Sequence, residues 1–222
     1  MRGIDGKRAA VLVSLLGANL YWSASLFYPI QLLVTLLHEM SHALAALATG
    51  GRVLRINVDP DLGGACLIQG GWPLIHIPAG YIGSSLIGAG ILLAASRSRL
   101  HRPIAAALGA LLLAMTVRYV RTPLGFGAGL VYGGFLVASG WMLRDWANEL
   151  LLSFIGVATL SYAFYDVKLL LSRPELRQRS DAYLFSAHVF PLPPLVWAAL
   201  WCAISTFIFF WTLRASVRRG KF

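Results

Sequence analysis

Long apolar segments constrain the fold of this 222-residue chain more than any other feature. A helix needs about 20 mostly apolar residues to cross a bilayer, and the chain contains several segments of that length. In addition, 58% of its residues are hydrophobic and only 13% are charged, which leaves more apolar surface than a soluble domain can bury. The sequence therefore predicts a single-domain, all-α integral membrane protein that covers residues 1–222.

We predict six to seven membrane-spanning helices. The candidate segments cover residues 9–28, 30–49, 77–96, 103–120, 124–143, 148–171 and 194–213. The join between the fourth and fifth segments is short, so one of these two could be re-entrant instead of crossing fully. A polar connector at residues 172–187 precedes the last segment.

The basic residues are concentrated next to the apolar segments. The formal net charge of the chain is +10. The basic residues that lie beside apolar segments are Arg2, Lys7, Arg8, Arg97, Arg99, Arg102, Arg173, Arg177, Arg179, Arg214, Arg218, Arg219 and Lys221. Such positions are typical of anchors at the surface of a lipid bilayer. No basic stretch alternates with aromatic residues on a polar face, so we expect no nucleic-acid partner.

Residues 52–69 carry the only strand signal in the chain. Residues 52–58 and parts of 64–69 alternate apolar and polar side chains, and Asp59-Pro-Asp-Leu-Gly-Gly64 between them is typical of a turn. The sequence predicts a short β-hairpin after the second helix. Because unpaired backbone cannot face lipid, this hairpin must lie at the membrane surface or be packed into the protein.

The motif His38-Glu-Met-Ser-His42 lies inside the apolar segment 30–49. On a helix, residues four positions apart share one face, so His38 and His42 can bind one zinc ion. Glu39 is offset by about 100° around the helix, beside the metal, where its carboxylate can act as a general base. Ionisable groups in the middle of a membrane helix are energetically expensive and usually functional.

A hydrolytic zinc site with two histidines needs one further protein ligand. We expect Asp166 in this role, because its distance from the end of segment 148–171 matches that of His42 from the end of segment 30–49 to within about 3 Å, if the two helices run the same way. The alternative is Asp181, in a connector that could fold back over the site. The other histidines (His76, His101, His188) lie at helix starts or membrane edges, and Asn57, Asp59 and Asp61 suit a turn better than a metal site.

With these residues in place, the chain resembles the M50 family of intramembrane zinc proteases, the site-2 proteases, and in particular their M50B-like branch. The resemblance covers most of residues 29–205. It is carried by the zinc motif with Ala43-Leu-Ala-Ala-Leu-Ala-Thr-Gly-Gly51, by Arg55-Ile-Asn-Val-Asp-Pro-Asp61, by Gly70-Gly-Trp72 with Ala79-Gly-Tyr-Ile-Gly83, and by Ser180-Asp-Ala182 before a Trp-rich helix.

The resemblance implies a zinc metalloendopeptidase that hydrolyses peptide bonds in or near transmembrane segments of other proteins. It implies that His38 and His42 are zinc ligands and that Glu39 is the catalytic base. The family takes its third ligand from a Leu-Asp-Gly motif, which is absent here, so Asp166 is assigned by position. Substrate-binding candidates are Asn57, Gly70 and Gly71, and the expected location is a bacterial inner membrane.

Two other functions are compatible with the same residues. One is a catalytically inactive, membrane-embedded zinc-binding scaffold that binds partner proteins. The other is a small metal or ion transporter that uses His38, Glu39, His42 and Asp166 as a relay.

Overall fold

The computed structural model describes residues 25–217, and it confirms a helical membrane protein with one hairpin. Within these residues, six helical segments are long and apolar enough to cross a membrane: Ser25–Ala48, Ala79–Arg97, His101–Tyr119, Pro123–Met142, Asp145–Ser172 and Pro194–Val217. They correspond to six of the seven predicted segments. The remaining segment, residues 9–28, lies largely outside the described residues.

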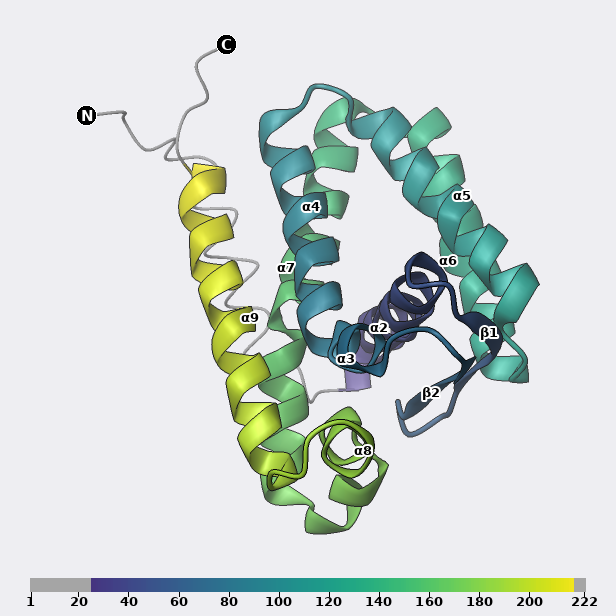
Figure 1. Cartoon of the computed structure of the whole chain (residues 1–222). Coiled ribbons are helices and arrows are strands. Elements are labelled where there is room, and N and C mark those ends of the chain that lie inside the picture. Colours follow the sequence, from purple (N-terminus) through teal and green to yellow (C-terminus); the bar gives the residue numbers. More distant parts are fainter. Residues whose placement is uncertain (1–24, 218–222) are drawn as a thin grey trace.

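The long helices form two packed groups (Figure 1). Helices α4 (Ser84–Arg97), α7 (Asp145–Ser172) and α9 (Pro194–Val217) lie side by side, and α5 (His101–Tyr119) pairs with α6 (Pro123–Met142). Glycines sit where the helices of a group meet: a Cβ on Gly156 would lie 2.9 Å from the backbone nitrogen of Leu92 across the α4–α7 contact. Close approach of helices at small residues is a common way of packing in membranes.

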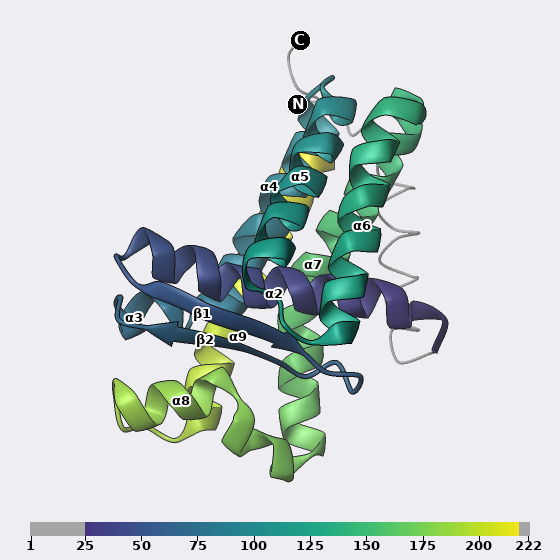
Figure 2. The ribbon, with the colours of Figure 1, turned by 90° about the vertical axis from the view of Figure 1, so that its right-hand side faces the viewer.

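Helix α2 (Tyr28–Ala48) carries the zinc motif and lies across the other helices in Figure 2. Pro29 occupies its first turn, where the missing backbone N–H costs no hydrogen bond. Gly50, with a φ of 79°, ends the helix, and the backbone nitrogen of Gly51 donates to the carbonyl of Ala46 over 2.8 Å. The predicted helix at 30–49 is therefore confirmed, but its direction differs from that of its neighbours.

The predicted hairpin is also confirmed. Strands β1 (Arg52–Val58) and β2 (Gly64–Gln69) pair antiparallel and pack on α2. The other edge of β1 is occupied by the α5–α6 junction, since the backbone nitrogen of Arg121 donates to the carbonyl of Ile56 over 3.0 Å. In the described part of the chain no strand pairs with the outer edge of β2, which lies on the side of the hairpin towards α8 (Asp181–His188) in Figure 2.

Two segments are more elaborate than the sequence indicated. The predicted helix at 77–96 begins as a short helix, α3 (Pro73–His76), and a π-helical turn, η2 (Ala79–Gly83), before it continues as α4. The polar connector folds into a 3₁₀ segment, η3 (Pro174–Arg179), and then α8, which packs against α9. Both segments lie close to the zinc motif.

Candidate metal centre

The two histidines of the motif meet on one face of α2. Their Nε2 atoms are 3.3 Å apart, and their ring centroids are 4.9 Å apart. Only 6% of His38 and 5% of His42 is exposed. The spacing of four residues therefore places two buried imidazole nitrogens close enough to share one ion, and their role as ligands stays a prediction.

The orientation of the His42 ring is fixed by a backbone group. Nδ1 of His42 lies 2.7 Å from the carbonyl oxygen of His76. Because a carbonyl only accepts, Nδ1 must carry the proton, so Nε2 of the neutral ring presents a free lone pair. A hydrogen bond of this kind is what usually orients a metal-binding histidine.

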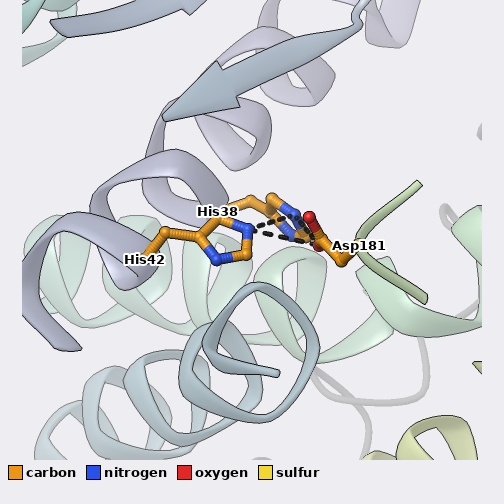
Figure 3. Close-up of side chains that lie close together, drawn as sticks. All are labelled: His38, His42 and Asp181. Atoms are coloured by element: carbon orange, nitrogen blue, oxygen red, sulfur yellow. Dashed lines mark hydrogen bonds and ion pairs between the residues drawn. The ribbon is translucent and has the colours of Figure 1, made fainter. Parts of the chain in front are cut away.

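Asp181 completes the group from a distant part of the sequence. Its Oδ2 atom lies 3.2 Å from Nε2 of His38 and 3.2 Å from Nε2 of His42 (Figure 3). Burial raises the pKa of Asp181, but without the ion, attraction to protonated His42 and the hydrogen bonds that protonated imidazoles donate to this carboxylate outweigh burial and hold its pKa below the usual range. The carboxylate is therefore ionised at neutral pH, as a metal ligand must be.

These three atoms fit a zinc ion. In a tetrahedral site with ligand bonds of about 2.0–2.1 Å, two ligand atoms lie roughly 3.3–3.4 Å apart, and the observed separations are 3.2–3.3 Å. Among the described residues, His38, His42 and Asp181 form the only such group of histidine, cysteine, aspartate and glutamate side chains. Three protein ligands leave the fourth position for water or substrate, as in catalytic zinc sites.

Gly80 in the π-helical turn keeps this space open. A Cβ on Gly80 would lie 2.5 Å from Nε2 of His38 and 2.6 Å from Oδ2 of Asp181. Any side chain there would overlap the three candidate ligand atoms. The backbone of η2 thus forms a close wall of the metal centre, and π-helical turns are often found at functional sites.

Glu39 lies next to the group but is not part of it. Glu39 is only 4% exposed, and strand β2 begins directly against its side chain. A Cβ on Gly64, the first residue of β2, would lie 2.7 Å from Cδ of Glu39. The first residue of β2 and the Glu39 carboxylate therefore lie in close contact. The carboxylate does not belong to the three-atom group formed by His38, His42 and Asp181.

The structure does not bring Asp166, the expected third ligand, into the three-atom group. Asp166 instead accepts a hydrogen bond from the hydroxyl of Tyr81. The position-based expectation assumed that α2 and α7 run in the same direction, whereas α2 lies across α7 in Figure 2. Distances counted along the two helices therefore do not give equal depths, and the geometry favours the alternative, Asp181.

Several neighbours of the centre were not singled out from the sequence. The ring of Tyr162 lies 4.8 Å from that of His38, and the ring of Tyr81 lies 6.1 Å from it. Tyr81 lies in Ala79-Gly-Tyr-Ile-Gly83, which carries part of the family resemblance, so the sequence held a signal for it. The sequence held no signal for the carbonyl of His76, because the backbone carbonyl group is the same in every residue.

The predicted substrate-binding residues lie on and beside the hairpin. Asn57 pairs with Ala65 in the register of β1 and β2. Gly70 and Gly71, with φ values of 72° and 74°, turn the chain back towards the end of α2. There the backbone nitrogen of Trp72 donates to Oγ1 of Thr49 over 3.2 Å. Their role in substrate binding stays a prediction.

Comparison with known proteins gives one match. The family model described as peptidase M50B-like matches residues 11–212 of the chain. Neither the curated proteins nor the solved structures gave a match.

Proposed function

This chain belongs to the peptidase M50B-like family, and from that membership we propose that it is an intramembrane zinc metalloprotease. Its reaction is the hydrolysis of peptide bonds in or near transmembrane segments of other proteins. The observation that supports the proposal is a triangle of zinc-site dimensions beside Glu39. Two imidazole nitrogens of a membrane-spanning helix and one carboxylate oxygen of Asp181, from the connector before α9, form this triangle.

The chemistry follows from the residues around the centre. His38, His42 and Asp181 would hold the ion. Bound zinc supplies a Lewis acid that activates water and polarises the scissile carbonyl. Glu39 accepts the proton released by the attacking water and delivers it to the leaving amine. The surrounding burial excludes bulk water, which strengthens electrostatic interactions within the site.

The hairpin offers a place for the substrate. A peptide bond inside a helix is shielded by its own turn, so the substrate segment must be extended before it is cut. The outer edge of β2 has no partner strand among the described residues, and β2 begins against Glu39. An extended segment that pairs with this edge through backbone hydrogen bonds would pass beside the catalytic carboxylate.

The membrane setting agrees with such substrates. The described part of the chain is a multi-pass membrane protein with six candidate spans, so a substrate helix could reach it laterally through lipid. We propose that its partners are transmembrane proteins and that its location is a bacterial inner membrane.

The test measures the zinc content and the cleavage activity of the same protein preparations. We expect about one zinc per purified wild-type chain, and cleavage of a reporter whose membrane helix contains a helix-breaking segment. Glu39→Gln should keep the zinc and abolish cleavage, because it removes only the proton acceptor. Cleavage that persists in Glu39→Gln would rule out the assigned mechanism. A zinc-loaded wild type that binds such reporters but never cuts them would favour the inactive scaffold.

A further inference from the structure

The two histidines of the metal centre are held in different ways. His42 donates its Nδ1 proton to the carbonyl of His76 over 2.7 Å. Nδ1 of His38 is buried and has no hydrogen-bond partner among residues 25–217. Metal-binding histidines almost always use the second ring nitrogen for such a bond, so something else must fix the orientation of the His38 ring.

Two tyrosine rings enclose His38. The ring of Tyr162 lies 4.8 Å from it at an interplanar angle of 54°, and the ring of Tyr81 lies 6.1 Å from it at 66°. Tyr162 comes from α7 and Tyr81 from the π-helical turn, so the imidazole is confined by two separate elements. Ring contacts of this kind restrict the rotation of the imidazole even without a hydrogen bond.

Asp166 fixes one of these two rings. Tyr81 is 1% exposed, and its hydroxyl donates to Asp166. Asp166 follows Tyr162 by four residues on α7, so both lie on the face of that helix towards the metal centre. The same face therefore supplies one ring to His38 directly and anchors the other through a hydrogen bond.

The backbone of Tyr81 is anchored as well. Its carbonyl accepts from Oγ of Ser85 over 2.8 Å and from Oγ of Ser205 on α9 over 3.3 Å. With the backbone held, the ring of Tyr81 can change position mainly by rotation of its side chain. The hydrogen bond to Asp166 at the far end of the ring opposes that rotation.

We infer that Asp166 is a positioning residue of the metal centre, which acts through Tyr81 to fix the ring of His38. This inference rests on the metal site of the proposed function and does not require proteolysis. It explains why a half-buried carboxylate lies close to the centre without joining the three ligand atoms. Its loss should leave all three ligands in place but orient His38 less well.

The experiment measures the affinity and geometry of metal binding in the full-length chain. The variants are Asp166→Asn, Tyr81→Phe and the double variant, each titrated with Zn²⁺ against a chromophoric chelator and loaded with Co²⁺ for its visible spectrum. Both single variants should still bind one ion per chain, with affinity reduced about 10–100-fold, which is typical of residues that orient metal ligands. The Co²⁺ spectrum should change in both. The double variant should bind Zn²⁺ no more weakly than the weaker of the two single variants, because both substitutions remove the same hydrogen bond.

Matched controls separate positioning from a general loss of stability. Asp145→Asn changes an exposed carboxylate on the same helix and should leave affinity and spectrum unchanged. Tyr81→Phe keeps the ring and removes only the hydroxyl, so it should fold even if Asp166→Asn does not. A variant that only destabilised the fold would unfold at a lower temperature but keep the wild-type Co²⁺ spectrum, and that result would overturn the inference.

The remaining outcomes are equally decisive. If Asp166→Asn abolished stoichiometric binding while Asp181→Asn did not, Asp166 would be a ligand and the inference would be wrong. Additive losses in the double variant would show that the two residues act independently. A wild-type chain that bound no zinc would overturn the metal site and this inference together, whereas a zinc-binding chain without protease activity would overturn only the proposed reaction.

Discussion

Nε2 of His38 and Oδ2 of Asp181 lie 3.2 Å apart, although 143 positions separate the two residues in the sequence. The contact joins a membrane-spanning helix to a short helix in the connector before α9. Ser180 caps that short helix, since its Oγ accepts from the backbone nitrogen of Tyr183 over 3.3 Å. The connector therefore places Asp181 at a defined helix start that faces the two histidines.

Replacing Asp181 should remove the metal. In Asp181→Ala only two of the three candidate ligands remain, so we expect the zinc content of the purified chain to fall from about one per chain to near zero. Asp166→Ala should retain the ion at saturating zinc. Elemental analysis after dialysis without chelator measures both. The reverse pattern would restore Asp166 as the third ligand.

Gly80→Ala should also prevent metal binding, although Gly80 supplies no ligand. Its new Cβ would lie 2.5 Å from Nε2 of His38 and 2.6 Å from Oδ2 of Asp181, so these groups would be pushed apart. Gly90→Ala is the matched control on the following helix, since a Cβ there meets nothing within 4 Å. Zinc titration of the two variants compares them. Equal, wild-type affinity in both would contradict the assignment of Gly80 as a wall of the site.

Gly64→Ala should lower the catalytic rate and leave the zinc content unchanged. The added Cβ would lie 2.7 Å from Cδ of Glu39 and displace the proton acceptor, and its three nearest atoms all belong to Glu39. We expect a loss in kcat of at least tenfold, since general-base catalysis contributes about 10²–10⁴-fold. Gly127→Ala, with open space around its Cβ, is the control. Loss of zinc in Gly64→Ala would show that the hairpin supports the metal as well.

Zinc affinity should fall steeply in mild acid. Zinc binds only neutral imidazoles, so in mild acid a protonated histidine must release its proton before it can hold the ion. Asp181, whose pKa is held below its usual range, stays ionised there and releases no proton on metal binding. The two histidines therefore release at most two protons per ion, which predicts a loss of zinc affinity of up to about 100-fold per pH unit in acid. A slope of three protons, measured by zinc titration at several pH values, would show that the carboxylate titrates too.

Gly156→Ala should destabilise the fold without touching the metal centre. Its Cβ would lie 2.9 Å from the backbone nitrogen of Leu92 and 3.0 Å from the carbonyl of Gly88, so α4 and α7 would have to move apart. Overpacking of this kind costs about 1–3 kcal/mol. Thermal unfolding in detergent measures the loss. Gly134→Ala on α6, which meets nothing within 4 Å, should unfold at or above the wild-type temperature.

Much of the fold was predictable because its signals are local. A helix that crosses a membrane must be apolar along its own length, so the apolar segments of the sequence located the six candidate spans among the described residues. The hairpin followed from alternation within 52–69, and its turn from Asp59-Pro-Asp-Leu-Gly-Gly64. The π-helical turn and helix α8 were missed, because a change from an α-helical to a π-helical turn, or a short helix in a polar connector, leaves little pattern over so few residues.

The arrangement of the three ionisable side chains on α2 could be predicted from local sequence. His38, Glu39 and His42 lie within one and a half turns of a single helix, so their relative positions follow from helix geometry. The residues that reach this helix from other elements depend on how the helices pack. They are Asp181 in the group of three, Asp166 as the partner of Tyr81, and Gly64 and Gly80, whose backbones lie against the site. These contacts could not be predicted because α2 lies across its neighbours (Figure 2). The depth of a residue along its own helix therefore does not determine which side chains meet, and only the packing of the helices brings these residues together.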